Sequence, residues 1–404
     1  MTSIIRQSSR VAFPICAVVI WLVAGSTLAG DLNPPAGPVA PTHKTLTEIE
    51  PRTAISVANT PGDADSLFKI TQPGSYYLTG NITGVAGKHG VEIATSGISL
   101  DLKGFTLTGV AGSLDGVSVT VNNLQNISVV NGSVRSWGDE GIDLGTMPSR
   151  GCRVEHILAV SNAGNGIAVG LATTVSDCSA YINTGHGIAT NSGCTVSMCT
   201  TYANSDNGIN TGAGCSVIAC SSNNNTNSGI LTGFAGTISN CSTRSNFGAG
   251  INAAGFGTRV DNCTAYQNAL SGIEATSGCS VVECTTRINS LDGILCSNQC
   301  VIRGNNCTSD GLGVSDGAGI HATGADNRIE GNSCAGADRG IDVDADSNII
   351  IRNTCTGNTT DWDIVANNVF GPIIDQRVPA SPAVSGFSAA GSLGSTDPNA
   401  NFSY

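Results

Sequence analysis

The feature that most constrains the fold of this chain is a repeat of about 21 residues, marked by glycine followed by isoleucine or valine. The repeat glycines are Gly90, Gly116, Gly141, Gly166, Gly187, Gly208, Gly229, Gly250, Gly272, Gly293, Gly319 and Gly340. Their successive spacings lie between 21 and 26 residues. A period of this length indicates stacked units, none of which can bury its hydrophobic face alone.

The content of one unit indicates which kind of stack forms. In "GIATNSGCTVSMCTTYANSDN", residues 187–207, three short β-type runs alternate with turn residues. No apolar pattern of helical period is present. Three strands and three turns per unit predict an all-β fold, a single-stranded right-handed parallel β-helix of about twelve coils with repeats of 21 to 26 residues.

Two further residue types keep the phase of the glycine. Asparagine lies four residues before it at Asn162, Asn183, Asn204, Asn225, Asn246, Asn268 and Asn289. Cysteine follows it by twelve or thirteen residues at Cys178, Cys199, Cys220, Cys241, Cys263 and Cys284. Stacked amides can donate to one coil and accept from the other, so we expect an asparagine ladder. We expect the cysteines to point inward as a ladder of mostly reduced thiols.

Composition and charge restrict the partners. Thirty acidic residues against eighteen basic ones give a formal net charge of −12, which repels nucleic acid at long range. Two further cysteine pairs lie near turns of adjacent coils, and Cys194 with Cys215 and Cys279 with Cys300 are disulfide candidates if the protein is exported. No pair has CxxC spacing, and one face of a ladder cannot supply the tetrahedral geometry of a zinc site.

The N-terminal residues predict export. Arg6 and Arg10 precede the apolar run "VAFPICAVVIWLVAG" and small residues ending "STLAG", so residues 1–29 are expected to be a signal peptide. Cleavage would leave no membrane span and send the protein outside the cell, to the cell surface or to the periplasm. We expect a proline-rich linker and cap over residues 30–54, the β-helix over 55–374 and a loosely ordered tail over 375–404.

The last coils contain "VIRGNNC", "RIEGNSC" and "IIIRNTC", and an early coil reads "ISLDLKGFTLTG". These stretches resemble the Asn-rich repeats of bacterial β-helix proteins with a pectate-lyase-like fold, grouped as carbohydrate-binding and sugar-hydrolysis domains. The resemblance covers roughly residues 55 to 370 and implies the fold. It leaves the chemistry open, because this fold carries lyases, hydrolases, tailspikes and passive surface proteins.

A second resemblance is confined to one tripeptide. Gly185-His186-Gly187 is similar to the tripeptide that carries a catalytic-site histidine in polygalacturonases, where the histidine works with aspartates that include an adjacent pair. This chain has no Asp-Asp pair anywhere. The residues before the repeat glycines vary from His to Asp, Ala and Arg, so we interpret His186 as one member of a variable column.

A column six residues before the glycine suggests a binding surface. It holds Tyr181, Tyr202, Asn223, Arg244, Tyr266 and Arg287. If these side chains face outward, the tyrosine and arginine residues form a stripe that can stack on sugar rings and hydrogen-bond their hydroxyls. A packing column without a ligand is the alternative interpretation.

Acidic residues gather in the last coils. His321 and Asp342 should be neighbours about 5 Å apart, close enough for an acid–base pair. Asp338, Asp342 and Asp344 are candidates for a calcium site, and no other cofactor is indicated. A solvated acidic face near the end of the stack is the alternative.

These patterns favour an exported β-helix that acts as a structural and binding module for a polysaccharide or cell-surface glycan, without catalysis. One alternative is a polysaccharide lyase or glycoside hydrolase that works through the C-terminal acidic coils. Another is a tailspike-like adhesin, which trimerisation would distinguish.

Overall fold

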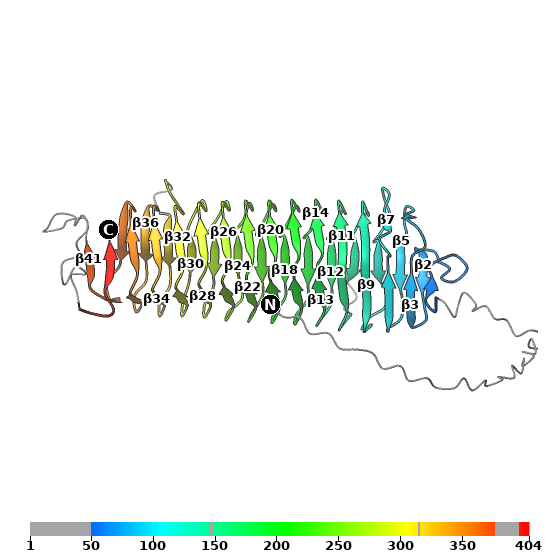
Figure 1. The fold of residues 1–404 in the computed structure, drawn as a ribbon, viewed down its shortest axis with the longest axis horizontal. Helices are drawn as coiled ribbons and strands as arrows, with labels where there is room; N and C mark the ends of the chain where they lie inside the picture. Colours follow the sequence, from blue (N-terminus) through cyan, green and yellow to red (C-terminus); the bar gives the residue numbers. More distant parts are fainter. Residues whose placement is uncertain (1–49, 146–148, 314–315, 376–395, 404) are drawn as a thin grey trace, which may run out of the picture. The chain divides into compact units, whose positions relative to one another are not determined.

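A computed structural model describes residues 50–145, 149–313, 316–375 and 396–403. The predicted signal peptide, most of the predicted linker and much of the predicted tail lie outside these residues. From Arg52 onward the described chain forms one unit, in which strands stack in chain order along one axis (Figure 1). This unit is a right-handed parallel β-helix, as the repeat predicts.

Each coil contributes strands to three faces, and equivalent strands of successive coils pair in parallel. The first face has 14 strands. They are β2 (Ser66–Ile70), β5 (His89–Ile93), β8 (Val117–Val119), β10 (Ile142–Leu144), β12 (Ile167–Val169), β15 (Ile188–Thr190), β18 (Ile209–Thr211), β21 (Ile230–Thr232), β24 (Ile251–Ala253), β27 (Ile273–Ala275), β30 (Ile294–Cys296), β33 (Ala318–Ala322), β36 (Arg339–Val343) and β39 (Thr360–Ile364).

The second and third faces are joined by two long strands that run through both, β9 (Ile127–Arg135) and β11 (Arg153–Val160). The other strands of the second face are β1 (Thr53–Ala54), β3 (Gly74–Tyr77), β6 (Ile98–Asp101), β13 (Thr174–Ser176), β16 (Thr195–Ser197), β19 (Ser216–Ile218), β22 (Thr237–Ser239), β25 (Arg259–Asp261), β28 (Ser280–Val282), β31 (Val301–Arg303), β34 (Arg328–Glu330), β37 (Ile349–Ile351) and β40 (Val369–Phe370).

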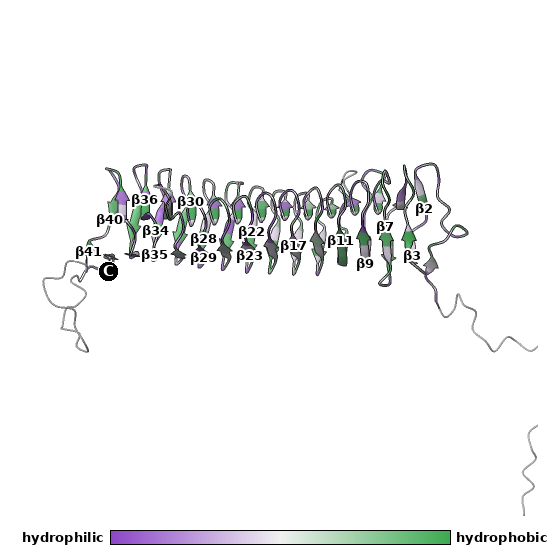
Figure 2. Ribbon diagram, turned by 90° about the horizontal axis from the view of Figure 1, so that it is seen from above, coloured by the Kyte–Doolittle hydropathy of each residue, from purple (hydrophilic) through white to green (hydrophobic). Residues whose placement is uncertain are grey.

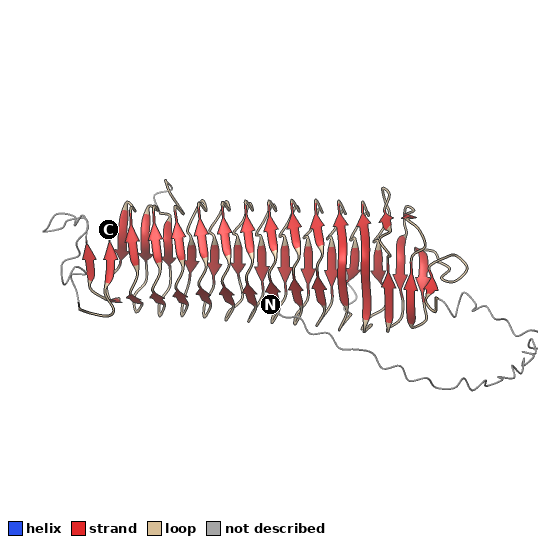
Figure 3. Cartoon of the chain, in the orientation of Figure 1, coloured by secondary structure: helices blue, strands red, loops and turns tan. Residues whose placement is uncertain are grey.

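The third face follows the second within each coil. Its other strands are β4 (Ile82–Thr83), β7 (Thr106–Thr108), β14 (Ser179–Tyr181), β17 (Thr200–Tyr202), β20 (Ser221–Asn223), β23 (Ser242–Arg244), β26 (Thr264–Tyr266), β29 (Thr285–Arg287), β32 (Asn306–Thr308), β35 (Ser333–Ala335), β38 (Thr354–Thr356), β41 (Ile373–Asp375) and β42 (Asn401–Ser403). Figure 3 shows strands and loops along the described chain, with no helix among these residues. The described residues therefore include no helix that could cross a membrane.

The number of coils exceeds the twelve expected from the glycines, because the first face has 14 strands. The two additional strands are β2 and β39, at the ends of the stack. The register places Leu67 and Asp361 where the other coils have the repeat glycine. Terminal units of a repeat fold have no neighbour on one side and commonly depart from the repeat sequence.

The core consists of columns of inward side chains, and hydrophobic strand segments recur along the stack (Figure 2). Isoleucine dominates the first face and valine the second, as at Ile188 and Val196, both with an exposed fraction of 0%. The third face has smaller inward residues, such as Ala180 and Thr201. β-Branched side chains suit stacked strands, which explains the short Ile- and Val-centred runs of the repeat.

The coil turns at residues with left-handed backbone conformation. In the coil that begins at Gly187 these are Gly193, Met198 and Ala203, with φ of 71°, 53° and 53°. The residue that follows each corner points inward and is buried: Cys194, Cys199 and Asn204 in this coil. Two cysteine columns and one asparagine column thus occupy equivalent places at the three corners.

The asparagine ladder is confirmed in detail. Asn183 donates from its backbone N–H and from Nδ2 to Oδ1 of Asn204, at 3.1 and 3.0 Å. The Nδ2 of Asn204 also donates to the carbonyl of Ala180 at 3.0 Å. Each side chain thereby provides hydrogen-bond partners for the backbone at the buried corner of the preceding coil, as buried polar groups require.

The repeat glycine is needed because the backbone passes close to this ladder. A Cβ at Gly187 would lie 2.6 Å from the carbonyl oxygen of Gly208 and 2.7 Å from Nδ2 of Asn204. No side chain fits in that space. Glycine and asparagine keep the same phase because they are two parts of one corner.

The C-terminal boundary differs from the expected loosely ordered tail. Although residues 376–395 lie outside the described chain, Asn401–Ser403 forms β42, which pairs with both β38 and β41. Oδ1 of Asn401 accepts the backbone N–H of Asn353 at 2.9 Å. This part of the tail is therefore a strand of the β-helix, which it joins through the same amide contact as the internal coils.

Candidate functional site

The predicted stripe of tyrosine and arginine residues lies on the third face. The register pairs Tyr181 with Tyr202 and Arg244 with Tyr266, at the last positions of neighbouring strands. Asn223 and Arg287 occupy the same column. The structure therefore brings all the predicted stripe residues into a continuous line along the stack, about 4.8 Å apart from coil to coil.

The stripe is open to solvent. Tyr202 is 46% exposed, and its hydroxyl accepts a hydrogen bond from Nδ2 of Asn224 at 3.3 Å. Tyr181 and Tyr266 are half-buried, whereas Arg244 and Arg287 are exposed. The guanidinium of Arg244 lies over the ring of Tyr266, 5.4 Å from its centroid. This is within the roughly 6 Å of a cation–π pair.

A second column runs beside the stripe, at the first position of the same strands. It consists of Ser179, Thr200, Ser221, Ser242, Thr264 and Thr285, all exposed or half-buried. The third face thus presents a flat row of hydroxyl groups next to a row of aromatic and guanidinium groups. Such a pair of rows offers both apolar contact and hydrogen-bonding partners.

The stripe also includes a residue that the sequence interpretation missed. Arg135 ends β9, and the register continues from Arg135 through Val160 to Tyr181. A shallow hollow of about 120 Å³ adjoins these residues. Arg135 lies six residues before Gly141, so the phase of the repeat could have identified it.

The expected pair at the C-terminal coils is also present. His321 on β33 is the register partner of Asp342 on β36, and Nε2 of His321 lies 3.7 Å from Oδ2 of Asp342. Both side chains are buried, with exposed fractions of 9% and 3%. Their burial departs from the expected solvated acidic face.

Three carboxylates surround this histidine. Oδ2 of Asp344 lies 3.0 Å from Nε2 of His321, and Oδ2 of Asp292 lies 3.5 Å from its Nδ1. Although burial acts in the opposite direction, these carboxylates raise the pKa of His321 to about 9. The imidazole is therefore protonated at neutral pH. Burial raises the pKa of Asp342 to about 6.

Arg339 joins the same network. Its guanidinium lies 3.0 Å from carboxylate oxygens of Asp342 and Asp363 and also pairs with Asp316. A hollow of about 470 Å³ adjoins Arg339 and Asp363. The last coils thus contain a dense network of ion pairs. It can hold a proton on His321, but most of its charged groups already have a partner.

The predicted calcium ligands are only partly brought together. His321, Asp342 and Asp344 offer ligand atoms within 4.8 Å of one another, whereas the carboxylate of Asp338 accepts the backbone N–H of Gly313 at 3.1 Å. A protonated histidine cannot ligate a cation. A cation at this position would therefore compete with the proton on His321, because histidine must lose its proton to ligate a metal.

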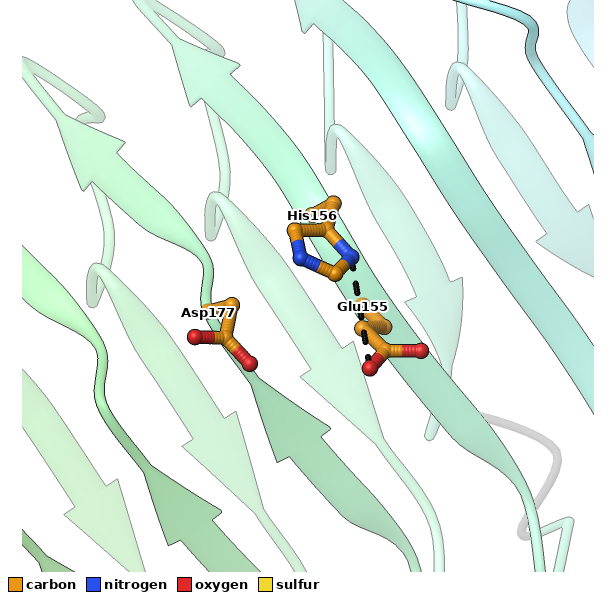
Figure 4. A group of neighbouring side chains, drawn as sticks. All are labelled: Glu155, His156 and Asp177. Carbon is orange, nitrogen blue, oxygen red and sulfur yellow. Dashed lines mark ion pairs between the residues drawn. The ribbon is translucent and has the colours of Figure 1, made fainter. Parts of the chain in front are cut away.

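A group with metal-ligand chemistry lies at the corner between the second and third faces. Glu155 and His156 extend from β11, and Asp177 lies on the next coil (Figure 4). Their ligand atoms lie within 4.8 Å of one another. Glu155 already pairs with Arg153, and His156 and Asp177 are exposed. Sequence reasoning missed this group because its column contains no recurring residue type, although His156 and Asp177 both lie ten residues before a repeat glycine.

Acidic residues also cluster on the first face near its N-terminal end. Asp115, Asp139 and Glu140 have carboxylate oxygens within 4.8 Å of one another. Burial and the neighbouring carboxyl of Asp139 raise the pKa of Glu140 to about 8. Glu140 borders a shallow hollow of about 220 Å³ that also contains Asn165 and Ala168. The arrangement holds a protonated carboxyl near neutral pH.

The contacts of His186 are with residues of neighbouring coils. Its Nε2 lies 2.9 Å from Nδ2 of Asn210, and its Nδ1 lies 3.4 Å from Oδ2 of Asp206. Its backbone N–H donates to Oδ1 of Asn165 at 2.8 Å. Burial lowers the pKa of His186 below its usual value. The column before the repeat glycine thus links neighbouring coils, as expected for a variable column.

The predicted disulfide pairs are not bonded in the structure. Cys194, Cys215, Cys279 and Cys300 are free and buried, like the other described cysteines. The backbone N–H of Cys194 donates to Sγ of Cys215 at 3.2 Å, so the sulfur takes the acceptor role that Oδ1 has in the asparagine ladder. This corner is held by a hydrogen bond instead of a covalent bond.

The fold and its columns define a right-handed parallel β-helix with solvent-exposed polar faces. No family model and no curated protein sequence matches the chain. Among solved structures, the N-terminal fragment of bacteriophage Phi29 gene product 12 is similar, with a TM-score of 0.50 and 13% identity over 75% of this chain and 69% of that one.

Two further structures are similar over most of their length. The A-module of mannuronan C-5 epimerase AlgE4 of Azotobacter vinelandii gives a TM-score of 0.49 and 13% identity over 74% of this chain and 90% of that one. The receptor-binding domain of the Siphovirus 9NA tailspike gives 0.48 and 11% over 88% and 83%. At such identities the likeness concerns the fold alone.

Proposed function

We propose that this protein is an exported, non-catalytic binding module that holds an extended polysaccharide or cell-surface glycan along its third face. The observation that carries the proposal is the unbroken line from Tyr181 to Arg287, in register on neighbouring strands and open to solvent. Export rests on the signal-peptide pattern of residues 1–29.

The chemistry of the face suits a sugar polymer. Tyrosine rings offer apolar area with a polar hydroxyl, and the parallel row of serine and threonine hydroxyls can exchange hydrogen bonds with sugar hydroxyls. Neighbouring strands are about 4.8 Å apart, which is close to the length of one pyranose unit in an extended chain. A polysaccharide along the axis would therefore place about one sugar unit over each coil.

The test is a binding measurement with a panel of neutral and acidic polysaccharides. We expect Tyr202→Ala and Arg244→Ala each to weaken binding about tenfold, because each removes one exposed contact from the centre of the stripe. Matched controls are Phe256→Ala, which removes an aromatic ring that is 61% exposed at another corner, and Arg303→Ala on the second face. Binding that is equal in all four variants would contradict the proposal.

A second candidate function is a polysaccharide lyase or hydrolase that uses His321 and Asp342. The observation that favours it is their buried pairing beside the hollow at Arg339. Incubation of the panel with and without calcium, followed by assays for reducing ends and unsaturated products, separates it from the binding module. Product that disappears in His321→Ala or Asp342→Ala would establish catalysis, and its absence in the wild type would favour binding alone.

A further inference from the structure

The third face differs from the rest of the protein in its charge. Between β7 and β38 its strands contain Arg135, Arg244 and Arg287 but no aspartate or glutamate. The chain as a whole has thirty acidic residues and a net charge of −12. Asp177 and Glu283 approach only the corner with the second face. A basic face in so acidic a chain requires a separate explanation.

The second face provides a direct comparison. There Arg259 pairs with Asp261, two residues along the same strand, at 2.7 Å. Arg328 pairs in the same way with Glu330 at 2.7 Å. Both second-face strands thus neutralise the charge of their arginine within the strand.

In the third-face strands the other outward position, two residues from the arginine, holds a hydroxyl instead of a carboxylate. Ser242 lies two residues before Arg244, and Thr285 lies two residues before Arg287. No ion pair of Arg135, Arg244 or Arg287 occurs among the residues that the structure describes. These guanidinium groups are therefore available to a carboxylate or sulfate from outside the chain, because the guanidinium fork can donate two hydrogen bonds to a pair of oxygens on such an anion.

We propose that the ligand of the third face is an anionic polysaccharide that lies along the stack. Its acidic groups meet Arg244 and Arg287, which are two coils and roughly 10 Å apart, so acidic groups on alternate sugars can be reached. Arg135 offers a third contact farther along the same column. The sugar rings lie over Tyr181, Tyr202 and Tyr266. This inference rests on the proposed function and specifies the class of ligand.

The test compares one polymer in two charge states. A polyuronate is titrated against the protein beside the same polymer with its carboxyl groups reduced to alcohols. We expect the acidic form to bind at least tenfold more tightly at low salt and to lose this advantage as salt is raised, because exposed charges are screened. Arg244→Gln and Arg287→Gln should each weaken binding of the acidic form about tenfold and weaken binding of the neutral form far less, since glutamine keeps a hydrogen-bond donor but not the charge. Arg303→Gln is the control of equal charge.

The outcomes separate the inference from the proposed function. Equal binding of both forms, lost in Tyr202→Ala and unchanged in the arginine variants, would overturn the anionic ligand and leave polysaccharide binding standing. Absence of binding by either form would contradict both. Tighter binding of a single-stranded oligonucleotide than of the polyuronate, lost in the arginine variants, would assign the face to nucleic acid and overturn the inference.

Discussion

Burial in the stack shifts the pKa values of individual side chains. Glu140 and His186 occupy the same column, and the neutral form of each side chain is favoured. The pKa of Glu140 is raised, whereas that of His186 is lowered. Burial is the first cause in both cases. His321 behaves differently because three carboxylates outweigh its burial. The same fold can therefore hold a neutral acid, a neutral histidine and a charged histidine.

Glu140 makes the stability of the protein depend on pH. Its pKa rises from 4.5 to about 8 on folding, so the folded state binds more protons than the unfolded state between these values. The stabilisation is present below about pH 4.5 and is lost as the pH rises to 8. Between pH 4.5 and 8 the unfolding free energy should therefore fall less in Glu140→Gln than in the wild type. We expect a difference on the order of 1 kcal/mol, since partial exposure screens the group.

The measurement is denaturant unfolding at a series of pH values from 4 to 9. Asp326→Asn, which changes an exposed carboxyl at another corner, is the control and should leave the profile unaltered. An unchanged pH profile in Glu140→Gln would show that the burial of this carboxyl does not contribute to the linkage.

At the scale of strands and corners, thiols and amides replace one another. The column of Cys284 continues as Asn305, and the backbone N–H of Cys284 donates to Oδ1 of Asn305 at 2.9 Å. Likewise Cys300 donates to Oδ1 of Asn327 at 2.8 Å. This exchange accounts for the change in repeat sequence in the last coils. Since sulfur is the weaker acceptor, the amide corners should contribute more stability.

Removal of one amide tests this ranking. Asn204→Ala removes the acceptor of the backbone N–H of Asn183 and one of the two acceptors of its Nδ2, so we expect a loss of about 3 kcal/mol in unfolding free energy. Cys199→Ala removes an equally buried side chain from another corner of the same coil and should cost about 1 kcal/mol. Denaturant unfolding of the two variants measures the difference. Equal losses would show that the ladder acts by packing alone.

Periodicity predicted most of these elements, because inward positions and corners recur with the glycine. It failed where the repeat is interrupted. The terminal strands β2 and β39 lack the glycine and so were not counted. His156 and Asp177 each lie ten residues before a repeat glycine, but the residue type in this column changes from coil to coil, so no recurring residue marks it.

The candidate sites show the same division. The Tyr/Arg column was predicted because it is periodic, and Arg135 was recoverable by the same rule. The pairing of His321 with Asp342 also followed from register. The contacts of His321 with Asp292 and Asp344 could not be predicted, because they depend on how side chains bend toward their neighbours across a face.

At the scale of the molecule, the cysteines behave as core residues. All fifteen from Cys152 onward are free and buried. Burial raises the pKa of Cys300 to about 11 and that of Cys296 well above its usual range. Such thiols are poor nucleophiles.

We therefore expect thiol reagents to modify the folded protein only slowly and the unfolded protein completely. A reducing agent should leave the midpoint of thermal unfolding unchanged, because none of the fifteen described cysteines forms a disulfide. Counting of reactive thiols with and without denaturant, beside melting curves with and without reductant, provides the measurement. A midpoint that falls by several degrees under reduction would establish the disulfides that Cys194 with Cys215 and Cys279 with Cys300 were expected to form.

The asparagine contacts have a direction. The N–H of Asn183 uses an oxygen from the following coil, and the same holds from Asn162 onward. On the ribosome, a corner therefore acquires its acceptor only after another coil has been translated. For Asn353 the acceptor is Asn401, 48 residues later. Assembly of the stack accordingly lags behind synthesis by one coil. At the corner of Asn353 the lag is more than two coils long.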